Sequence, residues 1–201
     1  MGWGGDVLIG IMGGTFDPIH TGHLVAAETA LEEAGLDEVW FMPANIPPHK
    51  PNTPLASPDQ RLEMVRLAID SHPSYRAVDV ELTRGGTSYT YDTVTRLQQL
   101  YPDHRFHYII GADMVMYLPK WHQIEKLSEM VTFLGVGRPG FDIDLEALPS
   151  RLRSRIKLMT MPAMEISSTD IRERIRNGRS IRYRVPDSVR LYIERSGIYG
   201  S

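Results

Sequence analysis

Short apolar runs alternate with segments of helical periodicity along this chain. Val7–Met12, "VLIGIM", precedes the helical pattern of His23–Ala34, and Glu38–Met42 precedes that of Ser57–Asp70. Such alternation is typical of parallel strands joined by crossover helices that cover both faces of one sheet. We therefore predict an α/β fold, a Rossmann-like doubly wound parallel sheet with flanking helices and a small C-terminal helical part.

The later segments continue this pattern. We expect four further strands, at Val78–Leu82, Phe106–Ile110, Thr132–Val136 and Ile156–Met159. We expect four further helices, at Thr90–Leu100, Gln123–Met130, Ser168–Asn177 and Pro186–Ser196. Gly35, Gly178 and Gly197 follow helical segments and predict their ends, whereas Ser57 and Gln60 predict a capping box at a helix start.

The composition is that of an ordinary globular protein. With 201 residues, of which 42% are hydrophobic, the chain can bury a core as one domain, and we expect one domain over 1–201 with 163–201 as its C-terminal helical part. The absence of cysteine excludes disulfides and thiolate catalysis. No apolar run approaches the ~20 residues of a membrane span, and Met1–Asp6 does not resemble a signal peptide. We expect a cytoplasmic protein without a membrane partner.

The charge is slightly negative overall and unevenly distributed. A net charge of -3 argues against a dedicated nucleic-acid-binding protein, which would be strongly basic. Arg172–Arg184 is rich in arginine, and for most of these side chains we favour the interpretation of a solvated basic helix face. We expect no nucleic-acid partner, and the sequence leaves open whether the chain forms a homo-oligomer.

The first strand runs into Gly13–His23, "GGTFDPIHTGH". Glycines allow the backbone to approach a ligand, and the helix that follows offers free N–H groups to an anion such as phosphate. His20 and His23 can both face that anion from the start of the helix. Two other interpretations exist: metal ligation with Asp17 as a third ligand, or one histidine capping a turn while the other is exposed. Because H-x-x-H lacks zincin spacing, we predict no protein-bound metal.

A proline-rich connection follows the second strand. Pro43–Pro58, "PANIPPHKPNTPLASP", cannot form regular structure, and loops at the carboxyl ends of strands are where α/β folds place ligands.

Five segments together resemble a known family. Gly13–His23 is similar to the first signature of the nucleotidyltransferase superfamily marked by T/H-x-G-H, and Ile166–Arg172, "ISSTDIR", resembles its second signature, ISSTxIR. Pro43–Lys50, Thr83–Thr93 and Ile109–Trp121 are similar to blocks of bacterial nicotinate-nucleotide adenylyltransferases, so the resemblance spans nearly the whole chain. "MGWGGD" at the N-terminus and residues 140–155 match no block.

A related family fits less well. Phosphopantetheine adenylyltransferases are shorter, have threonine at the position of His20, and lack the blocks around Tyr89–Thr93 and Trp121.

The resemblance implies transfer of AMP from ATP to nicotinate mononucleotide, which gives deamido-NAD and pyrophosphate in NAD biosynthesis. Magnesium would accompany ATP as the co-substrate, and the partners would be ATP and nicotinate mononucleotide. The implied catalytic residues are His20, His23 and Arg172. The implied ATP-binding residues are Gly13, Gly14, Thr15, Phe16, His20, His23, Gly111, Asp113, Ser168, Thr169 and Arg172.

The implied nicotinate-mononucleotide-binding residues are Asn45, Lys50, Thr87, Tyr89, Trp121, His122 and Arg138. Trp121 would stack on the pyridine ring, although core packing is the alternative for any tryptophan. Backbone N–H groups near Thr87 and His122 would hold the nicotinate carboxylate. Asp113 would accept hydrogen bonds from ribose hydroxyls, with a helix N-cap as its alternative.

Two further functions remain as alternatives. One is a non-catalytic module that only holds ATP, against which the intact His20, His23 and Arg172 argue. The other is an RNA-binding relative of class I tRNA synthetases, against which the chain length and acidic net charge argue.

Overall fold

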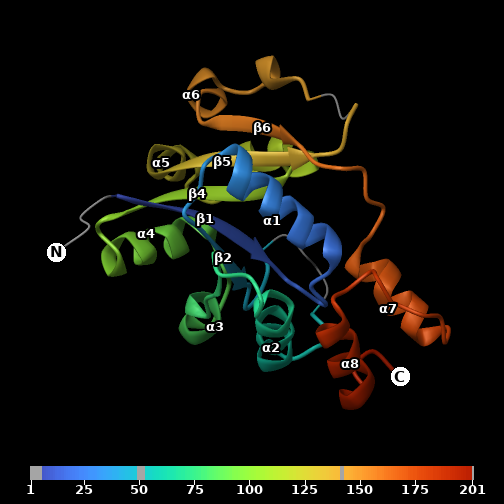
Figure 1. Ribbon diagram of the computed structural model, residues 1–201. Coiled ribbons are helices and arrows are strands. Elements are labelled where there is room, and N and C mark those ends of the chain that lie inside the picture. Colours follow the sequence, from blue (N-terminus) through green and yellow to red (C-terminus); the bar gives the residue numbers. More distant parts are fainter. Residues whose placement is uncertain (1–5, 49–52, 141–142, 201) are drawn as a thin grey trace.

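Six parallel strands form the central layer of the computed structural model, which describes residues 6–48, 53–140 and 143–200. Their order across the sheet is β3-β2-β1-β4-β5-β6 (Figure 1). The strands are β1 Val7–Gly14, β2 Glu38–Pro43, β3 Tyr75–Ala77, β4 His104–Gly111, β5 Val131–Gly137 and β6 Ile156–Thr160. The strand order reverses between β1 and β4, and the crevice beyond the carboxyl ends of such a pair is where this class of sheet binds ligands.

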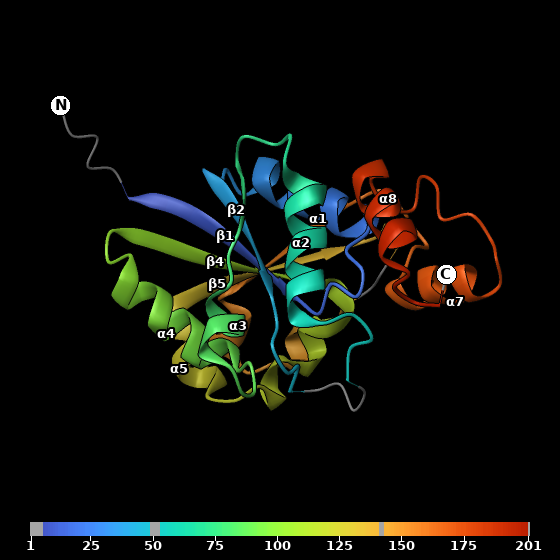
Figure 2. The same ribbon diagram turned by 90° about the horizontal axis from the view of Figure 1, so that it is seen from below.

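Helices cover both faces of the sheet (Figures 1 and 2). One hydrophobic cluster contains side chains of α1 Thr21–Glu33, α2 Pro58–Ile69, α7 Ser168–Arg176 and α8 Asp187–Ser196. The other contains side chains of α4 Thr90–Leu100, the 3₁₀ helix η1 Ala112–Lys120, α5 Ile124–Met130 and α6 Ser150–Arg153. The short α3 Val80–Arg84 and η2 Leu145–Ala147 complete the described elements. Within the described ranges, no helix has the length and apolar character needed to cross a bilayer.

The strands alternate their side chains between these two clusters. Val39 and Phe41 of β2 lie in the first cluster, whereas Trp40 and Met42 lie in the second. This period of two is the backbone geometry of a strand, and burial on both faces explains why the strands read as continuous apolar runs. The predicted doubly wound parallel sheet is confirmed.

Local signals at helix ends are also confirmed. The Gln60 N–H donates to Ser57 Oγ at 3.2 Å, and the Ser57 N–H donates to Gln60 Oε1 at 2.9 Å, which completes the capping box. Gly35 and Gly178 follow α1 and α7 with φ of +62° and +64°, the left-handed conformation expected of a helix stop.

The expected strand at Val78–Leu82 is wrong. The third strand is Tyr75–Ala77, and it ends where the Val78 N–H donates to the Phe41 carbonyl at 2.9 Å. The chain then turns into α3, because the Glu81 carboxylate is held in the interior by a hydroxyl of α4. A strand would direct Glu81 to the face opposite its apolar neighbours, whereas Glu81 is only 3% exposed.

Candidate active site

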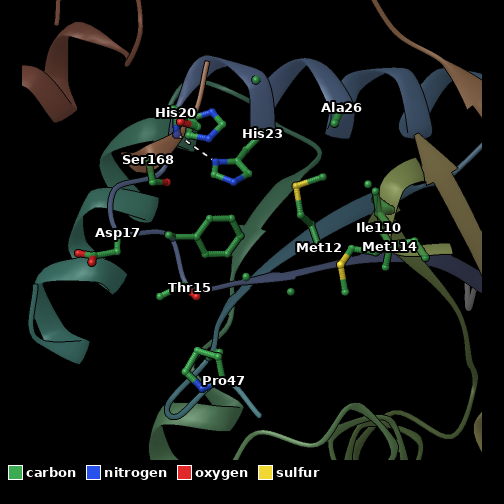
Figure 3. Close-up of a pocket in the computed structure, with 18 of the residues that line it drawn as sticks. Met12, Thr15, Asp17, His20, His23, Ala26, Pro47, Ile110, Met114 and Ser168 are labelled. Carbon is green, nitrogen blue, oxygen red and sulfur yellow. Dashed lines mark hydrogen bonds between the residues drawn. The ribbon is translucent and has the colours of Figure 1, made fainter. Parts of the chain in front are cut away.

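A cavity of about 1390 Å³ opens at the carboxyl edge of the sheet. Its walls come from the ends of β1, β4 and β5, the starts of α1 and α7, and residues within 44–48, 53–55 and 88–90. Figure 3 shows part of this wall, with His20 and His23 at the start of α1 and Met12 on β1. Its volume exceeds the ~300–1,000 Å³ usual for one small ligand, so it has room for two nucleotides.

The loop between β1 and α1 is shaped by close packing. A Cβ on Gly13 would lie 2.2 Å from the Tyr108 hydroxyl, so only glycine fits there. Phe16 has a φ of +51° and is 2% exposed, with its ring 5.1 Å from that of His23 and 6.1 Å from that of Phe41. A left-handed phenylalanine costs about 1–3 kcal/mol, and this packing offsets it.

His20 and His23 form a stacked pair at the start of α1. Their ring centroids lie 3.7 Å apart, and the His20 N–H donates to His23 Nδ1 at 3.1 Å. A Cβ on Gly22 would lie 3.1 Å from the His20 ring. Any larger residue between the two histidines would therefore crowd that ring. Burial lowers the pKa of His20 to about 4, so its ring is neutral at pH 7.

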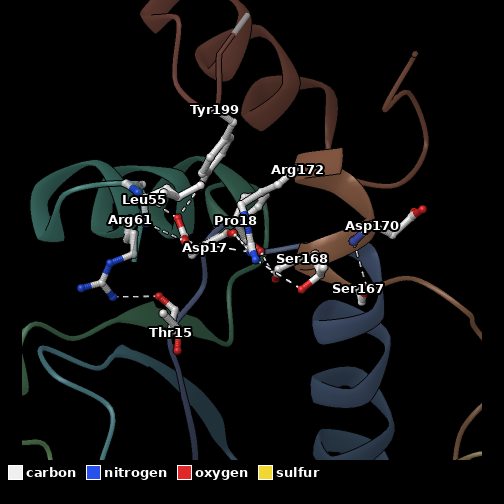
Figure 4. Close-up of polar contacts among 12 residues, drawn as sticks. Thr15, Asp17, Pro18, Leu55, Arg61, Ser167, Ser168, Asp170, Arg172 and Tyr199 are labelled. Atoms are coloured by element: carbon white, nitrogen blue, oxygen red, sulfur yellow. Dashed lines mark hydrogen bonds and ion pairs between the residues drawn. The ribbon is translucent and has the colours of Figure 1, made fainter. Parts of the chain in front are cut away.

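Asp17 anchors the loop instead of facing the histidines. Its Oδ1 accepts hydrogen bonds from the Ala56 N–H at 3.0 Å and the Tyr199 hydroxyl at 2.7 Å, and its Oδ2 accepts from the Leu55 N–H at 2.9 Å (Figure 4). The carboxylate is therefore committed to holding three distant segments together. Across the described ranges, no group of three or more acidic or histidine side chains is placed to hold a metal ion.

Arg61 of α2 supports the same loop from below. It is 1% exposed, and its Nη1 donates to the carbonyls of Thr15 and Ala44, both at 2.7 Å. Burial lowers its pKa, while the charges of Asp17 and Tyr199 act in the opposite direction. The guanidinium thus links the residue after β1 to the residue after β2, and both of these residues border the cavity.

The start of α7 lies directly against the first loop (Figure 4). Ser168 Oγ donates to the Pro18 carbonyl at 2.8 Å, and Arg172 Nη1 donates to the Asp17 carbonyl at 2.7 Å. Arg172 Nη2 also donates to Thr169 Oγ1 at 3.2 Å. Ser167 caps the helix, since its Oγ accepts from the Asp170 N–H at 3.1 Å. Two segments about 150 residues apart in sequence thus form one surface of the cavity.

Aromatic rings line the far end of the cavity. Trp121 contacts the rings of Tyr108 and Phe133 edge to face, with centroids 5.8 and 6.1 Å apart, and it also borders the cavity. The rings of Tyr89 and His122 lie 4.6 Å apart beside it. Trp121 therefore packs against core rings, as its alternative proposed, and also borders the cavity, so stacking on a ligand ring stays a prediction.

Most of the residues implied by the resemblance border this cavity. They are Gly13, Gly14, Thr15, Phe16, His20, His23, Tyr89, Gly111, Asp113, Trp121, His122, Arg138, Ser168, Thr169 and Arg172. Arg138 lies at the rim, 3.5 Å from the exposed carboxylate of Glu165. Asp113 is not the N-cap that its alternative proposed: Gly111 is the N-cap of η1, and Asp113 belongs to its first turn.

Three implied residues are placed differently. Asn45 and Thr87 do not border the cavity in the described structure, and Lys50 lies outside the described residues. The Asn45 N–H donates to Ser88 Oγ at 2.9 Å and Asn45 Nδ2 donates to the Gly86 carbonyl at 2.9 Å. Asn45 therefore joins the loop after β2 to the loop before α4, and it follows Ala44, which does border the cavity.

Sequence reasoning missed several residues that border the cavity, among them Glu81, Ser88, Thr90, Tyr108 and Arg176. Arg176 could have been found, because it follows Arg172 by four residues and thus shares its face of the helix. Glu81 carried only a weak signal, because Val78–Leu82 contains two acids, Asp79 and Glu81, in alternation with apolar residues.

The chain resembles known proteins along its length. Residues 11–174 match the cytidylyltransferase-like family. The chain is 50% identical over 192 residues to the probable nicotinate-nucleotide adenylyltransferase of Oceanobacillus iheyensis, covering 96% of each chain. It is 47% identical over 193 residues to the nicotinate-nucleotide adenylyltransferase of Bacillus subtilis, covering 96% of this chain and 98% of that one.

Solved structures share the fold. A Plasmodium falciparum nicotinic acid mononucleotide adenylyltransferase complexed with NaAD superposes with a TM-score of 0.74 at 24% identity, covering 96% of this chain and 97% of the other. The same protein complexed with APC gives a TM-score of 0.76 at 22% identity with the same coverage.

Proposed function

This chain belongs to the cytidylyltransferase-like family, and from that premise we infer that it is a nicotinate-nucleotide adenylyltransferase. It transfers AMP from ATP to nicotinate mononucleotide, forming deamido-NAD and pyrophosphate in NAD biosynthesis. The observation that carries this conclusion is near full-length identity of 47–50% to proteins of that name. The cavity supports it with a phosphate-compatible half and an aromatic half.

The reaction needs no general base. A 5′-phosphate has a second pKa of about 6, so the acceptor arrives largely as a dianion. One of its oxygens forms a bond to the α-phosphorus of ATP while the bond from that phosphorus to the bridging oxygen breaks, and pyrophosphate leaves with the electron pair. The protein's part is to hold the two nucleotides in line and to neutralise their charge.

We assign that part to the surface where α1 and α7 meet. Arg172 supplies a permanent cation whose position is fixed by the Asp17 carbonyl and Thr169. His20 and His23 supply N–H donors, and because His20 is neutral in the free protein, its positive charge develops only when phosphate is near. The first residues of α7 add free backbone N–H groups to the same surface.

Magnesium fits this cavity as part of the substrate. The Asp17 carboxylate is already engaged by three donors, and Glu81 is engaged by Thr93. The other two acids that border the cavity, Asp113 and Glu165, belong to no group of three or more potential metal ligands in the described part of the chain. We therefore propose that Mg²⁺ enters bound to ATP, with phosphate oxygens and water as its ligands.

The acceptor occupies the aromatic end, where the pyridine ring stacks on Trp121 beside the contacting rings of Tyr89 and His122. Asn45 shapes this end through the Ser88 loop.

We further propose that 163–201 is the helical part of one domain over 1–201, since α7 and α8 share the core cluster of α1 and α2. We place the reaction in the cytoplasm, the compartment that supplies ATP, with no nucleic-acid partner.

The experiment is a panel of acceptors. Purified protein with ATP and magnesium should release pyrophosphate when nicotinate mononucleotide is added, and far less with nicotinamide mononucleotide or phosphopantetheine. Equal rates with both mononucleotides would refute the acid specificity. Binding of ATP without pyrophosphate release for any acceptor would favour a nucleotide-binding module.

A further inference from the structure

Glu81 is a buried acid that the proposed reaction does not use. It is 3% exposed and borders the cavity, yet it lies far from α7 in the chain and belongs to none of the phosphate-binding segments. Burial of a carboxylate is unfavourable unless hydrogen bonds replace those it made with water. A buried carboxylate such as Glu81 can stabilise the relative positions of the groups that donate hydrogen bonds to it.

The Glu81 carboxylate joins α3 to α4 and faces the loop before α4. Thr93 Oγ1, on α4, donates to Glu81 Oε1 at 2.7 Å. The Ser88 hydroxyl, in the loop, lies near enough to the same carboxylate to lower its pKa. Thr93 is 0% exposed and Ser88 is 5% exposed, so the three side chains form a closed polar cluster inside the protein. Burial raises the pKa of Glu81, and the two hydroxyls act against that rise.

Ser88 transmits this anchoring to the cavity wall. Its Oγ accepts the Asn45 N–H at 2.9 Å, and its own N–H donates to the Ile46 carbonyl at 2.9 Å. The loop that carries Ser88 begins with Gly85 and Gly86, whose φ of +71° and +69° make its backbone easy to remodel. Hydrogen bonds with Asn45 and Ile46 thus hold Ser88 against the exit of β2, and Glu81 faces the same hydroxyl from the interior.

The same loop presents the aromatic end of the cavity. Ser88, Tyr89 and Thr90 all border the cavity, and the Tyr89 ring meets the His122 ring at 4.6 Å. A shift of the loop would displace Tyr89 and leave the contacts of Arg172 with Asp17 and Thr169 untouched, because α7 lies on the other side of β1.

We propose that Glu81 is a positioning residue for the acceptor nucleotide, acting through Ser88 to fix the 85–90 loop and with it the wall formed by Tyr89. It sets the affinity for nicotinate mononucleotide and leaves the affinity for ATP unchanged. The identity of the acceptor rests on the proposed function.

The test compares Glu81→Gln, Ser88→Ala and the double variant with wild type and with Glu129→Gln. Glu129 is exposed on α5, so its variant removes an acid at a site that does not border the cavity. Glu81→Gln should raise the KM for nicotinate mononucleotide roughly 5- to 30-fold, because its amide presents a donor to a hydroxyl that needs an acceptor. The KM for ATP should stay within about twofold, and Ser88→Ala should add little to the effect of Glu81→Gln if the residues act in series.

Three outcomes would overturn the inference: an unchanged KM for nicotinate mononucleotide in folded Glu81→Gln, an equal rise in both KM values, or additive effects in the double variant. Circular dichroism and thermal unfolding establish folding, and if Glu81→Gln does not fold, Ser88→Ala alone must show the selective rise. A wild-type protein that releases no pyrophosphate with this acceptor contradicts the proposed function and this inference together. An active wild type with an insensitive Glu81→Gln contradicts the inference alone.

Discussion

His20 combines a position beside the expected phosphates with burial that disfavours its charge. The ring is 7% exposed, is stacked on His23 at 3.7 Å, and has a pKa of about 4. A neutral imidazole can donate a hydrogen bond to an incoming phosphate, and the phosphate charge then favours protonation of the ring. His20 is thus a neutral hydrogen-bond donor in the free protein.

This low pKa makes folding stability depend on pH. Between pH 6.5 and 4 the unfolded chain binds a proton on His20 that the folded protein does not, so stability falls as pH falls through this range. Wild type should lose about 2 kcal/mol more than His20→Asn between pH 7.5 and pH 5. Urea unfolding of both proteins at the two pH values measures it, and an equal loss in both would contradict the burial of an uncharged His20.

Helix α7 carries two arginines toward the cavity with different tasks. Arg172 is fixed by Asp17 and Thr169, whereas Arg176, one turn later, borders the cavity and makes no ion pair with a described residue. Arg174, between them in the sequence, is half-buried and donates to the Ser180 carbonyl at 2.8 Å. Arg176 is exposed, as expected for most of this arginine-rich segment, and it also borders the cavity.

Arg176 should therefore assist the binding of the ATP phosphates. Arg176→Gln is expected to raise the KM for ATP about three- to tenfold, the scale of one charge-assisted contact at a solvated site. Arg179→Gln removes the same charge just beyond the end of α7, at a position that does not border the cavity, and it should leave KM unchanged. Equal changes in the KM for ATP would contradict a local contact of Arg176, and would show that the total positive charge of the segment attracts ATP.

The secondary structure could be predicted where the signal is local. The Ser57–Gln60 capping box and the glycine after α7 act within a few residues, and the sequence predicts both correctly. The prediction for Val78–Leu82 fails where the burial of Glu81 involves a partner, Thr93, that lies on a different helix and that local periodicity does not reveal. Burial of Asp17 and Arg61 likewise depends on partners that only the fold supplies.

At the scale of the whole molecule, the sheet order brings the first and last quarters of the chain together. Tyr199 reaches back across 182 positions to donate to Asp17 Oδ1, so the C-terminal end is part of the framework of the β1–α1 loop. The resemblance indicated that Gly13–His23 and Ile166–Arg172 act together. It did not indicate this buried framework behind them, because phenol and carboxylate pairing follows from three-dimensional contact alone.

Tyr199→Phe should lower the free energy of unfolding by about 1.5–3 kcal/mol, since it leaves a buried carboxylate with one donor fewer. Tyr183→Phe is the matched control, because the Tyr183 side chain is 84% exposed, and it should leave stability unchanged. Chemical denaturation gives both values. A Tyr199→Phe protein as stable as wild type would show that Asp17 does not depend on this contact.

Direct transfer of AMP between the two nucleotides is tested by following the α-phosphate of ATP. Protein incubated with α-labelled ATP, magnesium and nicotinate mononucleotide should move the label into the dinucleotide alone, with none on acid-quenched protein. His23→Ala should slow this transfer roughly 100-fold or more while remaining folded. Label found on the protein, or full activity of His23→Ala, would contradict direct transfer on the surface formed by α1 and α7.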